Sequence, residues 1–197
     1  MRNKICVFCG SSMGFDHIYR QKAELLANTM FEKGCELYYG GGSVGLMKVI
    51  ADTMLQRGGT VVGVIPTYLL DMEVGYKDIT QLIEVETMAD RKTQLETLSD
   101  AFIALPGGFG TMDELFEVLV LSQLRIIDKP VALYNINGYY DSLLQFIDHA
   151  VTEGYVSHEH RDNLIVSNDP CEILERLQQF KPVEISKWVD DIKNEIK

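Results

Sequence analysis

The chain has 197 residues, 46% of them hydrophobic, which is enough for one hydrophobic core and makes a single domain the default expectation. A net charge of −11 and a pI near 4.8, without any basic stripe, exclude a nucleic-acid-binding surface. There is neither an apolar run as long as a membrane span nor a signal peptide, and the four cysteines follow no disulfide framework. We therefore expect a cytoplasmic protein with reduced thiols and no membrane partner.

Strand-like and helical patterns alternate along the whole chain. The predicted strands cover residues 5–9, 36–39, 60–65, 81–86, 101–105, 131–134 and 164–166. The predicted helices cover residues 18–33, 45–57, 90–98, 111–124, 139–152 and 170–180. Continuous apolar strands separated by helices are typical of a parallel sheet covered on both faces. The sequence thus predicts an α/β fold: a three-layer, Rossmann-like parallel sheet of about seven strands, forming one domain over residues 1–180.

Three further segments have features of their own. Residues 67–80 form a loop or a short helix of the size of an active-site lid. Residues 181–197 form a C-terminal helical extension with an apolar face, which we expect to pack on the domain or on a partner. The helix over 111–124 is apolar around most of its circumference, which predicts burial on two sides, by the sheet and by a further partner such as a second subunit.

Glycine-rich turns follow three of the predicted strands, at residues 10–14, 40–45 and 106–111. In an open parallel sheet, ligands bind beyond the carboxyl ends of the strands. A single turn of this kind is explained by a tight connection between strand and helix, which glycine allows. Three such turns at one sheet edge favour a ligand site instead.

The second turn matches the dinucleotide-binding pattern G-x-G-x-x-G at Gly40, Gly42 and Gly45. That pattern requires an acidic residue at the end of the next strand to bind the ribose hydroxyls. Residues 62–67 contain none, so a nicotinamide dehydrogenase is disfavoured. The Walker A order of residues is also missing, which leaves ATPase or kinase chemistry without support.

The third turn, Pro-Gly-Gly-Phe-Gly-Thr at 106–111, combines an anion site with an acid. Its backbone N–H groups and the helix dipole behind them favour a bound anion, and Glu114 follows one turn inside the helix. This combination suggests chemistry on a phosphorylated molecule. As an alternative, Thr111-x-x-Glu114 fits a helix capping box. Glu117, one turn further on, could share sugar hydroxyls with Glu114.

Arg91 and Lys92 are adjacent cations that follow the predicted strand at 81–86. The planar guanidinium of Arg91 suits a phosphate or a developing oxyanion. The alternative is a solvated helix start in which Arg91 pairs with Asp90.

Two patterns that resemble metal sites have simpler explanations. Cys6 and Cys9 lie within or at the end of a strand, where their spacing directs them to opposite faces. His158 and His160 are two residues apart in a polar loop without a third ligand nearby. We predict no metal site.

The motif P-G-G-x-G-T-x-x-E at 106–114, together with Met88-x-x-Arg91-Lys92, resembles the LOG ("Lonely Guy") family. Its members are cytokinin riboside 5′-monophosphate phosphoribohydrolases that were long described as lysine decarboxylases. The resemblance extends over roughly the first 180 residues. It includes the segments V-F-C-G-S-S at 7–12, Y-G-G-G at 39–42 with G-L-M at 45–47, and D-K-P-V at 128–131.

The resemblance implies that Arg91 and Glu114 are the catalytic pair. It implies a substrate-binding set of Ser12, Gly42, Met88, Lys92, Gly107, Gly108, Phe109, Gly110, Thr111 and Glu117. It further implies a nucleoside 5′-monophosphate substrate, a homodimer, and no cofactor. Ala89 stands where many members have His, which bears on base preference or rate more than on the reaction.

We therefore expect a hydrolase that cleaves the N-glycosidic bond of adenosine 5′-monophosphate, plain or N6-modified, to free base and ribose 5-phosphate. The carboxylate of Glu114 fits an oxocarbenium-like transition state. Lysine decarboxylation would need pyridoxal phosphate on a lysine such as Lys92, and the neighbouring motif fits a nucleotide instead. The alternatives are a non-catalytic nucleotide or molybdenum-cofactor carrier, which would not need both Arg91 and Glu114, and a nucleotide-sensing module.

Overall fold

The computed structural model describes residues 3–72 and 75–182, so the predicted C-terminal helix lies almost entirely outside the described residues. The strands are β1 (Lys4–Phe8), β2 (Glu36–Tyr39), β3 (Val61–Pro66), β4 (Gln81–Val85), β5 (Ala101–Ala104), β6 (Val131–Tyr134) and β7 (Ile165–Ser167). The helices are α1 (His17–Glu32), α2 (Gly45–Gln56), α3 (Thr67–Asp71), α4 (Met88–Leu98), α5 (Phe109–Gln123), α6 (Asp141–Thr152), α7 (His158–Asn163) and α8 (Pro170–Gln179), with a 3-10 turn η1 (Ile136–Gly138).

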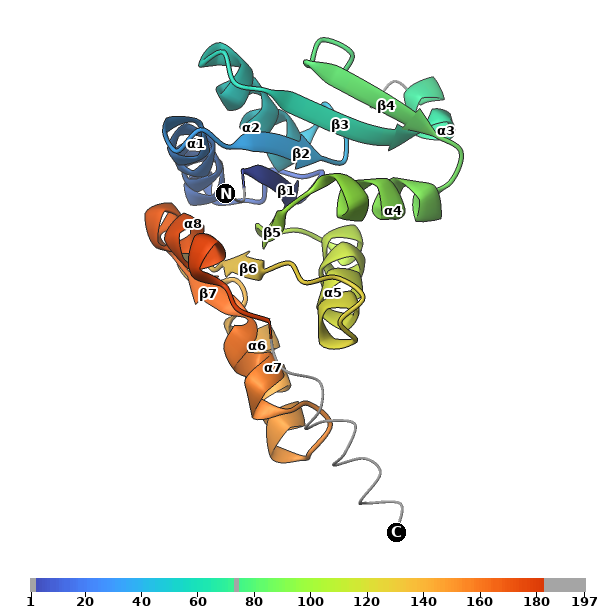
Figure 1. Ribbon diagram of the computed structural model, residues 1–197. Helices are drawn as coiled ribbons and strands as arrows, with labels where there is room; N and C mark the ends of the chain where they lie inside the picture. Colours follow the sequence, from blue (N-terminus) through green and yellow to red (C-terminus); the bar gives the residue numbers. More distant parts are fainter. Residues whose placement is uncertain (1–2, 73–74, 183–197) are drawn as a thin grey trace.

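The described strands form one seven-stranded sheet in the order β4-β3-β2-β1-β5-β6-β7, and each neighbouring pair is parallel. Helices cover both faces of the sheet (Figure 1). Core residues of α1, α2 and α8 pack on one face, and those of α4, α5 and α6 pack on the other. The predicted three-layer α/β architecture is confirmed.

The chain reverses its direction across the sheet between β1 and β5. From β1 it proceeds outward to β4, and α4 then returns across the sheet to β5 beside β1 (Figure 1). In open α/β sheets the crevice outside such a reversal point is the usual place of a ligand.

Alternation along β1 separates the two cysteines of the C-x-x-C pattern. Cys6 belongs to the core on the side of α4 and α5, whereas Cys9 belongs to the core on the side of α1 and α2. Both thiols are buried and free. The prediction that they point to opposite faces is confirmed.

Some helices begin elsewhere than the sequence pattern predicted, because their N-caps lie earlier in the chain. α4 begins at Met88 rather than at 90, and α5 begins at Phe109 rather than at 111. The prediction that His158–His160 lie in a loop is wrong, since they open α7. There the Ser157 side chain accepts a hydrogen bond from the His160 N–H and caps the helix.

The helix α5 has one buried and one exposed apolar side. Leu115 and Val118 are buried in the core against the sheet. Phe116, Val120 and Leu124, four residues apart, remain 39%, 49% and 45% exposed. Burial by the sheet is thus confirmed, and cover by a second subunit stays a prediction. None of the described helices is both long and apolar enough to cross a membrane.

Candidate active site

A cavity of about 400 Å³ lies beyond the carboxyl ends of the strands, at the point where the sheet order reverses. All three glycine turns contribute to its wall, through Gly10, Gly42 and Gly108 among others. Of the residues predicted to form the site, it is lined by Gly42, Met88, Arg91, Gly108, Phe109, Gly110, Thr111 and Glu114. Segments that are distant in the sequence therefore meet in one cavity.

The first turn of α5 presents backbone amides to this cavity. Its N-cap is Gly108, which has no side chain with which to cap the helix. Helix geometry leaves the first N–H groups without acceptors inside the helix, and here no side chain supplies one. The amides of Phe109, Gly110 and Thr111 therefore remain open to an anion, which the helix dipole also favours.

The capping-box interpretation of Thr111-x-x-Glu114 is wrong. Because Gly108 is the N-cap, Thr111 is already the third residue of α5 and Glu114 lies deeper in the helix. The structure instead has a capping box at the N-terminus of α4. There Thr87 Oγ1 accepts a hydrogen bond from the Asp90 N–H at 3.1 Å, and the Thr87 N–H donates to Asp90 Oδ2 at 3.1 Å.

Arg91 and Glu114 form a buried ion pair inside the cavity. Arg91 Nη1 lies 2.9 Å from Glu114 Oε1, and the two side chains are only 11% and 9% exposed. Arg91 Nε also donates to the carbonyl of Val64 at 3.1 Å. The alternative in which Arg91 is solvated and pairs with Asp90 is therefore wrong, since Asp90 caps α4 and Arg91 faces Glu114.

Gly40 provides the space for the Arg91 guanidinium. A Cβ atom built on Gly40 would overlap Nη2 of Arg91. Gly40, the first glycine of the apparent dinucleotide motif, is thus needed because the side chain of Arg91 lies against it. Glycine at this position is therefore explained without a bound dinucleotide, whose pyrophosphate such a motif would contact.

Burial raises the pKa of the Glu114 carboxyl above its usual value, while the neighbouring Arg91 acts in the opposite direction. A carboxylate with a raised pKa is a stronger proton acceptor, which suits a general base. Burial, together with the charge of Glu114, also raises the pKa of the Cys9 thiol in the cavity wall. Cys9 is therefore a neutral wall residue and not a nucleophile.

Lys92 and Glu117 do not line the cavity but pair with each other beside it. Lys92 Nζ lies 2.8 Å from Glu117 Oε2 and 3.1 Å from Asp113 Oδ2. The hydrogen bond to Glu117 raises the pKa of Lys92. A lysine that forms a Schiff base needs a lowered pKa, so Lys92 is poorly suited to pyridoxal phosphate chemistry.

Ser12 and Gly107 line a neighbouring cavity of about 280 Å³, together with Tyr19 and Tyr139. The two cavities share Gly10, Ser11 and Gly108, so they meet at the first and third glycine turns.

The residues that form an apolar wall of the main cavity were not predicted from the sequence. It consists of Val44, Met47, Ile65 and Leu69, beside the predicted Met88. Their sequence signal is weak, because each resembles an ordinary core residue. Only their place in the chain could have indicated them, since Val44 and Ile65 lie close to the carboxyl ends of β2 and β3, where ligands bind in such sheets.

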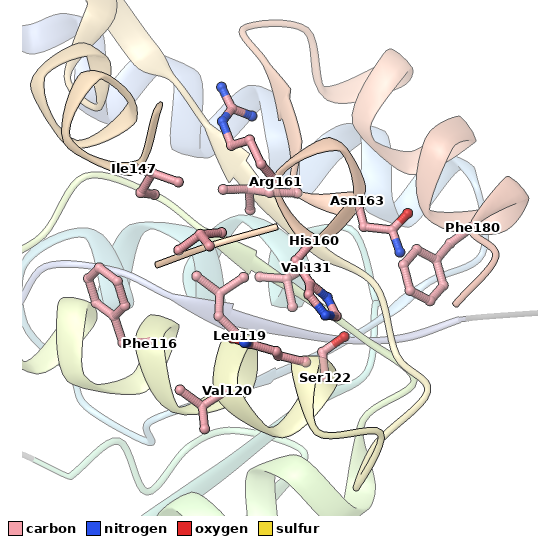
Figure 2. A pocket seen from close by; sticks show the side chains of 13 residues that line it. Phe116, Leu119, Val120, Ser122, Val131, Ile147, His160, Arg161, Asn163 and Phe180 are labelled. Atoms are coloured by element: carbon pink, nitrogen blue, oxygen red, sulfur yellow. The ribbon is translucent and has the colours of Figure 1, made fainter. Parts of the chain in front are cut away.

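A separate cavity of about 150 Å³ lies between α5, α6 and α7, away from the charged pair. Figure 2 shows Phe116, Leu119 and Val120 of α5 on one side of it and Ile147 of α6 near the other. Its lining is mostly apolar and holds no carboxylate. This cavity lacks the groups that the nucleotide chemistry requires.

Known structures share the fold of this chain. A molybdenum cofactor binding protein from Rippkaea orientalis superposes with a TM-score of 0.67 at 21% identity, covering 91% of this chain and 98% of that one. A molybdenum cofactor carrier protein from Chlamydomonas reinhardtii gives 0.66 at 19% identity, covering 90% and 98%. At these identities the likeness concerns the fold alone.

Sequence comparison identifies much nearer relatives. A family model described as "Possible lysine decarboxylase" matches residues 47–177. The cytokinin riboside 5′-monophosphate phosphoribohydrolase LOG2 of Arabidopsis thaliana is 45% identical over 191 residues, which span 95% of this chain and 90% of that protein. The enzyme LOG5 of the same plant is 42% identical over 180 residues, spanning 91% and 79%. With the motif residues gathered in one cavity and relatives this similar over nearly its full length, the chain belongs to the LOG family.

Proposed function

We propose that the protein hydrolyses the N-glycosidic bond of adenosine 5′-monophosphate, plain or N6-modified, to free base and ribose 5-phosphate. One observation carries the proposal: the open amides of α5 and the buried Arg91–Glu114 pair line the same cavity. The first can bind a phosphate and the second can act on the sugar attached to it. The names of the relatives, which are phosphoribohydrolases, support the same activity.

In the proposed reaction, the amides of Phe109, Gly110 and Thr111 bind the 5′-phosphate and fix the position of the sugar. This remote binding energy can then be used at the reacting carbon. The bond from C1′ to the base nitrogen breaks, and its electron pair leaves with the base, which takes up a proton from solvent water. A water molecule adds to C1′ and gives a proton to Glu114, which then releases it to solvent. The negative charge of Glu114 stabilises the oxocarbenium-like transition state, and Arg91 orients this carboxylate.

We assign the base and its substituent to the apolar wall formed by Val44, Met47, Ile65, Leu69 and Met88. These side chains offer contact area without hydrogen-bonding groups, which suits a planar base with an apolar N6 substituent. Leu69 of this wall lies in α3, within the segment 67–80 whose size is that of an active-site lid. Ala89, which stands where many members of the family have histidine, is exposed and does not line the cavity.

The direct test is to incubate the protein with AMP and with N6-isopentenyl-AMP and to measure free base, with adenosine as the substrate without phosphate. We expect cleavage of at least one nucleotide and much slower cleavage of adenosine. Glu114→Gln should lose at least about 100-fold in kcat, the range expected for a general base, while still binding AMP. A Glu114→Gln enzyme with full activity would remove our assignment. Binding of AMP without any cleavage would favour a non-catalytic carrier.

We further propose a homodimer formed through the exposed side of α5. Phe116, Val120 and Leu124 form a continuous apolar stripe there, and the apolar cavity beside α6 adjoins it (Figure 2). Such a patch is typical of a protein interface. Light scattering after gel filtration should give twice the chain mass for the natural protein and one chain mass for Val120→Glu. Tyr155→Glu, an equally drastic change at an exposed position off the stripe, should stay dimeric.

We place the protein in the cytoplasm. All four cysteines are free, and three of them are buried, as in proteins that fold under reducing conditions. Fractionation of cells that express a tagged chain would test this location.

A further inference from the structure

Tyr139 lies outside the segments that carry the family resemblance, yet it contacts the anion-binding turn. It follows η1 and precedes α6, and its hydroxyl donates a hydrogen bond to the Gly107 carbonyl at 2.6 Å. Its neighbour Tyr140 donates to the Leu105 carbonyl, also at 2.6 Å. Two successive tyrosines therefore bind two carbonyls of the segment that leads from β5 into the turn.

The hydrogen bond from Tyr139 fixes the orientation of one peptide group. The peptide between Gly107 and Gly108 is trans, so its carbonyl and its N–H point in opposite directions. Because the Gly107 carbonyl faces Tyr139, the Gly108 N–H faces away from it. Tyr139 and Gly107 line the smaller cavity, whereas Gly108 also lines the cavity of Arg91 and Glu114.

This peptide would otherwise have considerable freedom, since glycine flanks it on both sides. The preceding carbonyl, that of Pro106, is already held by the Gly10 N–H at 3.1 Å. The next carbonyl, that of Gly108, accepts the Met112 N–H at 3.1 Å within the first turn of α5. The Tyr139 hydroxyl supplies the matching restraint for the group between them.

The ring of Tyr139 is held independently of its hydroxyl. It packs edge-on against Tyr140, with ring centroids 5.1 Å apart, and edge-on against Tyr19 at 6.1 Å. Edge-to-face geometry of this kind is favourable for aromatic pairs. Replacing tyrosine by phenylalanine therefore removes the donor and keeps the packing.

We propose that Tyr139 is a positioning residue for phosphate binding: it orients the peptide between Gly107 and Gly108 so that the Gly108 N–H joins the open amides of α5. The inference rests on the proposed function only in taking the ligand to be a phosphate monoester. It predicts that loss of the hydroxyl weakens binding of phosphorylated ligands specifically.

The test compares dissociation constants, measured by calorimetry, for AMP, ribose 5-phosphate and adenosine. For Tyr139→Phe we expect about 3- to 10-fold weaker binding of AMP and ribose 5-phosphate, the worth of about one hydrogen bond, and an unchanged constant for adenosine. KM for the nucleotide should rise by a similar factor, with a smaller change in kcat. Tyr140→Phe should instead lower the melting temperature and affect AMP and adenosine alike. Tyr155→Phe, at an exposed position, controls for loss of a hydroxyl.

Equal losses for AMP and adenosine in Tyr139→Phe would show a merely structural role, and unchanged binding of AMP would also overturn the proposal. The outcome is separable from that of the proposed reaction, because affinities are read without turnover. A natural protein that binds AMP but does not cleave it contradicts the hydrolase function and leaves this comparison intact. A natural protein that binds neither AMP nor ribose 5-phosphate overturns both.

Discussion

The N-termini of α4 and α5 lie at the same edge of the sheet but are built in opposite ways. The N-terminus of α4 is capped by side chains, through the reciprocal hydrogen bonds of Thr87 and Asp90. α5 starts from Gly108, and no side chain caps its N-terminus. The capped helix α4 contributes the Arg91 side chain to the cavity, and the uncapped helix α5 contributes backbone amides as well as Glu114.

Because of this difference, the same edge of the sheet can hold the cationic side chain of Arg91 at α4 and favour a bound anion at α5. A cation in the first turn of α4 opposes the helix dipole, and the acidic side chain of Asp90 in the same turn offsets that dipole beside Arg91. At α5 the dipole is left uncompensated at its cap, which favours an anion. Exchanging these properties between the two helices tests what each N-terminus contributes to the site.

The largest effect should come from displacing the side chain that α4 contributes. Gly40→Ala places a methyl group where the Arg91 guanidinium lies, and the backbone of Gly40 does not require glycine by its φ angle. We expect kcat to fall by about 100-fold, as for other displacements of about 1 Å in an active site. In an Arg91→Ala background the same substitution should have little further effect. Additive losses in the double variant would refute this explanation of Gly40.

The next largest effect should come from giving α5 a side-chain N-cap like that of α4. Gly108→Asp adds a capping carboxylate to a position with open space around it and a negative φ. The carboxylate would compete with the phosphate, so we expect AMP to bind about 10- to 100-fold more weakly, the worth of one charged hydrogen bond. The melting temperature should stay equal or rise. Gly108→Ala, which adds bulk without charge, should lose much less affinity; equal losses would point to crowding instead.

A smaller effect concerns the acid on α5 and depends on pH. Because burial raises the pKa of Glu114, the carboxyl takes up protons at a higher pH than an ordinary glutamate. The acid limb of kcat/KM should therefore lie above the usual carboxyl range, with activity rising as pH increases through it. The folded state binds this proton more tightly than the unfolded state does, so ionisation lowers the free energy of unfolding as pH rises through the same window. Urea unfolding of the natural protein and of Glu114→Gln between pH 4 and 7 should show this difference in slope, and parallel curves would contradict it.

The smallest effect should come from removing the side-chain N-cap of α4. Thr87→Ala removes the capping hydroxyl, which accepts from the Asp90 N–H, and should lower the free energy of unfolding by about 1 kcal/mol. Nucleotide cleavage should change little, because the anion site is on the other helix. Thr97→Ala is the matched control in the same helix. The Thr97 hydroxyl donates a hydrogen bond to the Thr93 carbonyl one turn earlier, so its loss should not lower the free energy of unfolding. A large loss of activity in Thr87→Ala would mean that α4 also binds the phosphate.

Features that depend on local sequence were predicted well. The strands, the parallel sheet and the glycine turns follow from apolar runs and from the conformational freedom of glycine, both of which are visible within short windows. Arg91 and Glu114 were assigned to the site through a motif, and the structure brings them together at 2.9 Å. Their roles in binding and catalysis stay predictions.

Features that depend on contacts between distant segments could not be predicted. One local feature could not be predicted either: the T-x-x-E pattern at 111–114 is a capping box only if Thr111 is the N-cap, and the sequence does not decide this against Gly108. The role of Gly40 depends on a side chain that arrives from α4. The pairing of Lys92 with Glu117 and the bond from Tyr139 to Gly107 also join separate elements. None of these relations has a periodicity that a sequence pattern reveals.

The return of α4 across the sheet also bears on how the molecule folds. Arg91 precedes β5 in the chain and Glu114 follows it, so the two charges meet only once β5 has paired with β1 and joined the two halves of the sheet. Pairing of parallel strands through a long crossover is among the slower events in folding, because the chain entropy is lost before the contacts form. If Arg91 and Glu114 act as proposed, the recovery of catalysis during refolding reports when the two halves of the sheet have joined.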